Sequence, residues 1–125
     1  MLSRVKKAKL TDSAILATSD RATDDPLVEL AQQLNVPAFR GSETDVLGRF
    51  LEAASLSRAD HVIRVCGDNP LIAPEEIDRL VEFFEEFLQA GNNIVDRLYA
   101  FNFASKMGNG YPDGFGAEIL SRIRL

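Results

Sequence analysis

The stretch Arg64-Val65-Cys66-Gly67-Asp68-Asn69-Pro70 decides how this chain is interpreted. It follows an apolar run, residues 60–65, that predicts a buried parallel strand, and it precedes a helix predicted to begin near Pro74. A carboxylate at the carboxyl end of such a strand lies where open α/β sheets bind ligands. The glycine lets a backbone or a phosphate approach closely, and the proline stiffens the turn. Asp68 is therefore predicted to hold a divalent metal on a nucleotide phosphate.

Composition bounds the class of protein. The 125 residues suffice for one domain, and 46% hydrophobic with 26% charged residues predicts a folded chain. A net charge of −5 argues against a nucleic-acid partner, although a metal ion could supply charge for one phosphorylated small molecule. The single cysteine, Cys66, excludes an internal disulfide and a Cys-rich zinc site. No apolar run has membrane-spanning length and no signal-peptide core is present, so we expect a cytoplasmic protein without a membrane partner.

Strand and helix patterns alternate along the chain, which predicts an α/β fold with a parallel sheet. Strands are expected at residues 13–18, 36–40 and 61–65, with a weaker one at 94–95. Residues 2–10 are expected to be the end of a helix. Further helices are expected from Asp25, as N-cap, and Pro26, after a capping box of Ser42 and Asp45, and over residues 74–90. Residues 107–116 form a glycine-rich loop by composition.

Helical spacing predicts which apolar side chains point into the core. The expected inward positions are Leu27, Leu30, Ala31 and Leu34 in the first long helix, Val46, Leu47, Phe50, Leu51 and Ala54 in the second, and Ile77, Leu80, Val81, Phe84, Phe87 and Leu88 in the third. The neighbouring Phe83 is assigned to the same core cluster, and this cluster is not expected to be a stacking platform.

Five segments in order resemble the cytidylyltransferase family that includes spore-coat polysaccharide biosynthesis proteins, which is related to the acylneuraminate and 3-deoxy-manno-octulosonate cytidylyltransferases. They are A-T-S-D at 17–20, D-D-P-L-V-E-L-A at 24–31, F-R-G-S-E-T-D-V-L-G-R-F at 39–50, R-V-C-G-D-N-P-L-I at 64–72 and Y-P-D-G at 111–114. The resemblance implies a Rossmann-like nucleotidyltransferase fold, a glycosyltransferase A-like three-layer sandwich. It also implies transfer of CMP from CTP to a sugar or sugar acid, with Mg²⁺ as cofactor and pyrophosphate released, in cell-surface polysaccharide biosynthesis.

The sequence departs from the family pattern at two places. The family's first strand and its triphosphate loop, Q-A-R-x-x-S-x-R-L-P-x-K, are not found, and Gly116 stands where the family has a second aspartate. We therefore expect residues 1–125 to form a single, incomplete cytidylyltransferase-like domain with weak or absent transfer activity. In the family, the missing strand lies between the two strands that correspond to residues 13–18 and 61–65 of this chain. Its loss would leave two strand edges open. Either the two strands pair directly, or a partner chain fills the gap as in a homo-oligomer, or the chain folds poorly alone.

The resemblance assigns roles that each have a structural alternative. Asp68 and Arg64 are the catalytic candidates, and Asp68 is also the candidate metal ligand. As alternatives, Gly-Asp-Asn-Pro is an ordinary turn, and Arg64 could form a partly buried salt bridge. Glu118 is a second metal candidate. The nucleotide candidates are Ser19, Asp20, Ser42 and Arg49, of which the first two could merely cap the next segment and Arg49 could be a solvated charge. A lid over the sugar is assigned to Tyr111, Pro112, Asp113 and Gly114, which otherwise form a turn. Cys66 and His61 are interpreted as structural.

Two classes of function remain open at this point. The first is an Mg²⁺-dependent nucleotidyltransferase that acts on CTP and a sugar, with catalysis by positioning and by metal charge neutralisation. The second is a non-catalytic remnant, or a nucleotide- or sugar-binding module, that keeps the fold.

Overall fold

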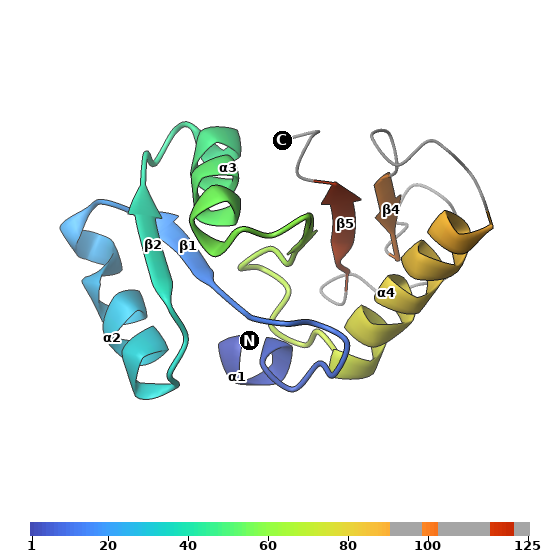
Figure 1. Ribbon diagram of the computed structural model, residues 1–125. Coiled ribbons are helices and arrows are strands. Elements are labelled where there is room, and N and C mark those ends of the chain that lie inside the picture. The colour runs from blue at the N-terminus through green and yellow to red at the C-terminus, as the bar shows by residue number, and fades with distance from the viewer. Residues whose placement is uncertain (91–98, 103–115, 122–125) are drawn as a thin grey trace.

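The structure is a computed structural model that describes residues 1–90, 99–102 and 116–121. Its elements, in chain order, are α1 (Leu2–Val5), β1 (Leu16–Ser19), a 3₁₀ turn (Ala22–Asp24), α2 (Asp25–Gln33), β2 (Ala38–Gly41), α3 (Val46–Ser57), β3 (His61–Arg64), α4 (Pro74–Gln89), β4 (Tyr99–Phe101) and β5 (Glu118–Ser121) (Figure 1). Helices and strands alternate as far as α4, so the predicted α/β fold is confirmed. The expected strand at residues 94–95 lies outside the described residues.

The first sheet is a parallel pair. Strands β1 and β2 run side by side, with Leu16 opposite Ala38 and Ser19 opposite Gly41. Helix α2 connects the two strands and lies beside them, as a crossover between parallel strands must (Figure 1). This arrangement brings the carboxyl ends of β1 and β2 to one edge of the molecule, where their following loops begin.

The second sheet is antiparallel, with the order β3-β5-β4. The prediction that residues 61–65 form a parallel strand buried on both faces is therefore wrong. The physical reason is the pairing partner, because β3 pairs with β5 from the far end of the chain, and only the face of β3 that carries Ile63 meets the core. Among the described strands β1 pairs only with β2 and β3 only with β5, so the two do not pair directly.

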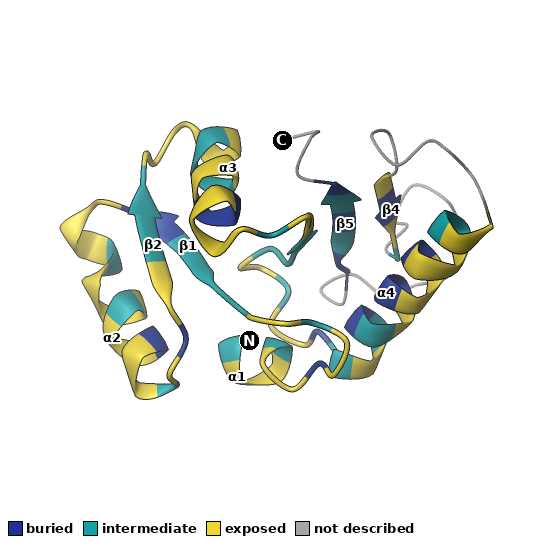
Figure 2. Ribbon diagram, viewed as in Figure 1, coloured by how far each residue is buried: buried dark blue, intermediate teal, exposed yellow. Residues whose placement is uncertain are grey.

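Helix α4 covers one face of the second sheet and forms the main core with it (Figure 2). The helix is amphipathic, and its buried side chains are those of Ile77, Leu80, Val81 and Phe84. They meet Ala100 and Ile119 from the strands. The prediction for this helix is correct at its start, Pro74, and one residue too long at its end. Glu75 and Glu76 lie in its first turn, where they oppose the positive end of the helix dipole.

Several side chains predicted to point inward are exposed instead. On α2 only Ala31 is buried, while Leu27 and Leu30 are 44% and 45% exposed, because a two-stranded sheet is too narrow to cover the whole stripe. On α3 the buried residues are Ala53 and Ala54. Exposed there, against expectation, are Val46, Leu47 and Leu51.

Phe83 is 57% exposed, which corrects its assignment to the core. One residue along a helix is a rotation of about 100°, so Phe83 leaves the stripe that its neighbour Phe84 occupies.

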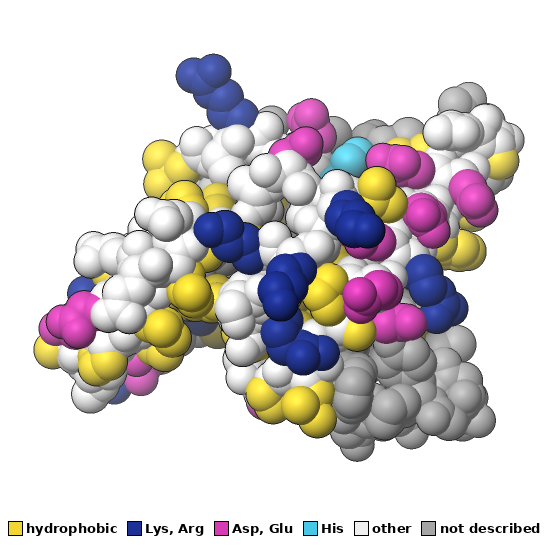
Figure 3. Space-filling model, turned by 90° about the horizontal axis from the view of Figure 1, so that it is seen from below, with side chains coloured by type: hydrophobic (Ala, Val, Ile, Leu, Met, Phe, Trp, Pro, Cys, Tyr) yellow, Lys and Arg dark blue, Asp and Glu magenta, His cyan; other side chains and the backbone are white. Residues whose placement is uncertain are grey.

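The N-terminal segment bridges the two halves of the molecule. Helix α1 is shorter than expected, and its basic side chains bind other elements rather than its own carboxyl end. The Nζ of Lys6 donates to the carbonyl of Leu34 at the end of α2, at 2.6 Å, and the Nε of Arg4 donates to the carbonyl of Ile72 at 2.7 Å. Seen from below, basic and acidic side chains are interspersed on this face (Figure 3). Within the described residues no helix is both long and apolar enough to cross a membrane.

Candidate functional site

A hydroxyl and carboxylate cluster closes the carboxyl end of β1. The hydroxyls of Thr18 and Ser19 each donate to Oδ2 of Asp24 at 2.6 Å, and the backbone N–H of Ser19 donates to the same oxygen at 3.0 Å. These hydrogen bonds lower the pKa of Asp24 to about 2, and the bond from the Ser19 hydroxyl makes the largest contribution. Ser19 therefore anchors the start of α2, which is the capping alternative that the sequence left open. Asp24, not Asp25, is the N-cap residue.

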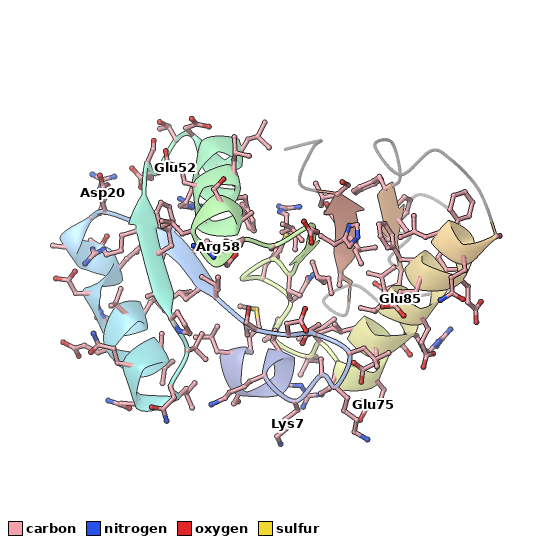
Figure 4. All side chains as sticks on the ribbon, viewed as in Figure 1. Lys7, Asp20, Glu52, Arg58, Glu75 and Glu85 are labelled. Atoms are coloured by element: carbon pink, nitrogen blue, oxygen red, sulfur yellow. The ribbon has the colours of Figure 1, made fainter. Side chains whose placement is uncertain are left out.

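Arg40 ties the ends of the two parallel strands together. Its Nε donates to the carbonyl of Ser19 at 3.1 Å, its Nη1 to Asp25 at 2.7 Å and its Nη2 to the carbonyl of Arg21 at 2.7 Å. The Asp20 side chain remains exposed beside this network and points away from the body of the molecule (Figure 4). Asp20 is thus accessible to a ligand, whereas Ser19 is occupied.

Ser42 and Arg49 meet at the start of α3, next to the end of β2. The Ser42 hydroxyl accepts from the backbone N–H of Asp45 at 3.0 Å, and the Ser42 carbonyl accepts from Nη1 of Arg49 at 2.9 Å. Asp45 is the N-cap residue, because its carboxylate accepts from the N–H of Gly48 at 2.8 Å. That carboxylate packs where a Cβ on residue 48 would stand, which explains the glycine. The helix end already holds an anion, so it does not favour a phosphate.

Arg49 carries the unsatisfied group of this region. Its Nε is buried without a hydrogen-bond partner among the described residues. A buried donor of this kind gains free energy when an acceptor reaches it. Arg49 lies beside Ser42 and near the end of β2, as the nucleotide assignment requires. Its side chain also holds the start of α3 through the hydrogen bond to the Ser42 carbonyl.

Arg64 and Glu118 form an ion pair across β3 and β5. The two residues are opposite each other in the register, and Nη1 of Arg64 donates to Oε1 of Glu118 at 2.7 Å. Their side chains are 37% and 15% exposed. The guanidinium also lies over the Phe50 ring of α3, 5.9 Å from its centroid. This is the salt-bridge alternative for Arg64, and it engages one oxygen of the metal candidate Glu118.

Asp68 lies in the exposed loop that follows β3. Its carboxylate has no hydrogen-bond partner in the part of the chain that the structure describes. The loop is held by Asn69, whose Nδ2 donates to the carbonyl of Gly116 at 2.7 Å and whose N–H donates to the carbonyl of Cys66 at 3.0 Å. Gly116, the position at which the sequence lacks an expected acid, therefore lies next to the Asp68 loop.

Cys66 is half-buried between these charged groups. Burial raises the pKa of its thiol, and Asp68 and Glu118 raise it further against the lowering effect of Arg64. A thiol kept protonated is a poor nucleophile, which agrees with a structural role. The other residue interpreted as structural, His61, packs edge-on against Phe84 with ring centroids 4.9 Å apart.

The donor set suits a magnesium ion only in part. Among the described residues no group of three His, Cys, Asp or Glu side chains is close enough to hold a metal ion. Magnesium in nucleotide sites is commonly bound by one or two carboxylates, with substrate phosphates and waters completing the octahedron. The accessible carboxylate of Asp68 fits that minimal requirement, and Glu118 would have to leave Arg64 to add a second.

A cavity of about 330 Å³ lies between the first turns of α3 and the free face of the second sheet. Its lining residues are Val46, Leu47, Phe50, Val62, Arg64, Tyr99, Glu118 and Leu120. Burial, together with the neighbouring Glu118 carboxylate, raises the pKa of Tyr99. The structure thus brings Arg64 and Glu118 together in a pocket that also contains Phe50 and Tyr99.

Some residues of this region were not predicted from the sequence, and some predicted residues lie outside the part of the chain that the structure describes. Asp24, Arg40, Phe50 and Tyr99 were not assigned to a site. A signal existed for Asp24, which follows two hydroxyl residues and precedes a helix, but none for Tyr99. The candidates for the sugar lid, Tyr111, Pro112, Asp113 and Gly114, lie outside the described residues and stay predictions.

In open α/β sheets, ligands bind at the carboxyl ends of the strands, which is where the polar side chains of β1 and β2 lie. The sequence pattern of the cytidylyltransferase family matches residues 1–101. The chain therefore belongs to the cytidylyltransferase family.

Solved and curated relatives agree with this assignment. A cytidylyltransferase from Leptospira borgpetersenii is similar with a TM-score of 0.82 and 29% identity, over 98% of this chain and 48% of that one. An uncharacterised protein of Methanocaldococcus jannaschii is 46% identical over 83 residues, 66% of this chain and 34% of that protein. The spore coat polysaccharide biosynthesis protein SpsF of Bacillus subtilis is 38% identical over 71 residues, 57% of this chain and 30% of SpsF. The 3-deoxy-manno-octulosonate cytidylyltransferase of Pelobacter propionicus is 36% identical over 81 residues, 62% of this chain and 30% of that enzyme.

The chain thus spans about a third of the length of the curated relatives and about half of the solved structure. The similarity to the solved structure confirms the predicted cytidylyltransferase type of fold.

Proposed function

We propose that this chain carries the nucleotide- and acceptor-binding part of an enzyme that transfers CMP from CTP to a sugar or sugar acid, releasing pyrophosphate. The observation that carries the proposal is the accessible Asp68 carboxylate in the loop after β3, whose last residue, Arg64, lines a pocket together with Glu118. Family membership supports the nucleotide. The names of two relatives, a spore coat polysaccharide biosynthesis protein and a 3-deoxy-manno-octulosonate cytidylyltransferase, support an acceptor in polysaccharide biosynthesis and a sugar acid as one acceptor class.

Each part of the site would have one task in this reaction. Asp68 would hold Mg²⁺, which when bound neutralises charge on the phosphates. Asp20, Ser42 and Arg49 lie at the carboxyl ends of β1 and β2, where an open α/β sheet takes a nucleotide. An acceptor oxygen would form a bond to the α-phosphorus while the bond to pyrophosphate breaks, and the acceptor proton would pass to solvent. The protein contributes mainly position and electrostatic stabilisation.

A second candidate, a nucleotide- or sugar-binding module without catalysis, is favoured by one observation. Ser19 is engaged with Asp24, and Asp68 belongs to no group of three potential metal-binding side chains among the described residues. A site with so few free groups can bind a nucleotide and still fail to accelerate the displacement.

Two measurements on the same preparation separate these candidates. Pyrophosphate release is followed with CTP, Mg²⁺ and a panel of neutral sugars and sugar acids, and CTP binding is followed by calorimetry. Release that needs Mg²⁺ and is lost in Asp68→Asn supports the transferase, and we expect it to be slower than about 1 s⁻¹, the low end for working enzymes. Binding without release supports the module, and the absence of both contradicts the proposal. Glu85→Gln, which removes a carboxylate on the exposed side of α4, is the matched control (Figure 4).

A further inference from the structure

The loop between β3 and α4 carries Asp68, and packing does little to hold it in one place. Gly67 and Asp68 are both exposed, and a Cβ added at Gly67 would meet no atom within 4 Å. Glycine loses more backbone freedom on ordering than any other residue, so an unpacked glycine beside Asp68 allows the carboxylate many positions. A defined position for this carboxylate therefore depends on the hydrogen bonds of the loop.

Both ends of the loop are fixed. At the upstream end, Arg64 closes β3 and is paired with Glu118 of β5. At the downstream end, Ile72 is 0% exposed in the main core, and its carbonyl accepts from Nε of Arg4 at 2.7 Å. The freedom that remains lies in residues 66–70.

The Asn69 side chain fixes this middle part. Its Nδ2 donates to the carbonyl of Gly116 at 2.7 Å, in a partly buried hydrogen bond. Among the hydrogen bonds between described residues, it alone joins residues 66–70 to a residue outside the loop. An asparagine that serves only a turn bonds to the backbone next to it, whereas this side chain reaches a carbonyl 47 positions further along the chain.

The segment that accepts this bond is itself held firmly. Ala117, the next residue, is 1% exposed, and its N–H donates to Oδ1 of Asn102 at 2.8 Å. The Ala117 carbonyl accepts from the N–H of Asn102 at 3.2 Å, and Nδ2 of Asn102 donates to the carbonyl of Glu76 in the first turn of α4 at 3.1 Å. Asn69 therefore fastens the loop to a point that is tied to both the sheet and the helix.

We propose that Asn69 is a positioning residue, whose side-chain amide tethers the loop to the start of β5 and thereby holds the Asp68 carboxylate in place to bind a metal ion. Gly116 lies two residues before Glu118, so the same bond sets the loop relative to the second metal candidate. The amide is uncharged and acts through position alone. The metal in this statement rests on the proposed function, whereas the tether does not.

A double-mutant cycle tests whether Asn69 acts through Asp68. Calorimetric titration of CTP with Mg²⁺ into the whole chain is carried out for the wild type, Asn69→Ala, Asp68→Asn and the double variant. Residues that orient a metal ligand without touching the metal typically change metal affinity by about 10–100-fold, so Asn69→Ala should weaken Mg²⁺-dependent binding by about tenfold. In the Asp68→Asn background the same change should cost less than about twofold, because no carboxylate is left to position.

Asn102→Ala is the matched control. It makes the same substitution close by and removes the side-chain bonds to Ala117 and Glu76, but it leaves Asn69 and the Gly116 carbonyl in place. It should lower the melting temperature at least as much as Asn69→Ala does, and change Mg²⁺-dependent binding by less than about twofold.

Amide hydrogen exchange in the chain without ligand tests the tether by itself. The N–H groups of residues 69 and 72 donate hydrogen bonds inside the loop, so their exchange rates report its order. Asn69→Ala should speed exchange at these two positions several-fold more than along α4.

Three results would overturn the inference: an equal loss of binding from Asn69→Ala in both backgrounds, no loss in the wild-type background, or an equal loss from Asn102→Ala. Each leaves the proposed function standing, provided that Asp68→Asn weakens binding. If the wild type does not bind CTP with Mg²⁺, the proposed function fails and with it the metal. The tether is then decided by exchange, and unchanged rates at residues 69 and 72 in Asn69→Ala would refute it.

Discussion

Two adjacent phenylalanines on α4 provide a matched test of the fold. Phe84 is 1% exposed and packs in the main core, whereas Phe83 is 57% exposed. Truncating a buried phenylalanine to alanine costs about 3–5 kcal/mol through lost transfer free energy and the cavity left behind. Phe84→Ala also loses the edge contact with His61, and such ring pairs contribute about 0.5–1.5 kcal/mol. Phe83→Ala removes mostly solvated area and should cost about 1 kcal/mol or less.

The comparison cancels the effects that the two variants share. Both replace phenylalanine by alanine in the interior of one helix, so the gain in helix propensity is the same. The chain has no tryptophan, so unfolding in urea is followed by far-UV circular dichroism. With a slope of about 2 kcal/mol per molar urea, Phe84→Ala should lower the midpoint by about 2 M and Phe83→Ala by about 0.5 M or less.

Equal losses in the two variants would refute the placement of α4 on the second sheet. A larger loss for Phe83→Ala would show that the helix packs through a different face. If Phe84→Ala is too unstable to measure, Phe84→Leu against Phe83→Leu preserves the comparison at smaller magnitude.

Two further predictions follow from single side chains. Asp24 has a pKa of about 2 in the folded chain against an ordinary value of 3.8, so its stabilisation is complete above pH 3.8 and is lost as pH falls toward 2. Asp24→Asn should therefore lower the urea midpoint clearly at about pH 6 and less at about pH 3, and a constant difference would contradict the hydrogen-bonded carboxylate. Because burial raises the pKa of Cys66, iodoacetamide should alkylate the folded chain more slowly than the urea-unfolded chain at the same mildly alkaline pH, and faster reaction of the folded chain would indicate an activated thiol.

Local signals in the sequence were enough to locate α2, α3 and α4, whereas α1 is shorter than expected. Helix α4 was predicted within one residue because Pro74, two acidic residues and an apolar stripe all act within the segment itself. The start of α2 was missed by one residue because Asp24 and Asp25 have equal propensity as caps, and the hydrogen bonds from Thr18 and Ser19 to Asp24 decide between them.

Long-range pairing could not be predicted in the same way. The direction of β3 depends on β5, and the partner of Arg64 lies 54 residues further along the chain. An apolar run such as residues 60–65 has the same appearance in either sheet, because hydrophobicity records burial and not the direction of the neighbour. For the same reason Arg64 and Glu118 were both assigned to a site without being recognised as a pair. Asp68 was singled out because a short motif at a strand end carries its own mechanism, and its metal-binding role stays a prediction.

The central claim is that Asp68 holds the metal of a bound nucleotide. Calorimetric titration of CTP into the chain, with and without Mg²⁺, tests it most directly for the wild type, Asp68→Asn and Glu85→Gln. The account predicts that binding needs Mg²⁺, that Asp68→Asn weakens it at least tenfold, or by about 1.4 kcal/mol, and that Glu85→Gln leaves it unchanged. Equal CTP binding by the wild type and Asp68→Asn in the presence of Mg²⁺ would contradict the claim and leave Asp68 as a turn residue.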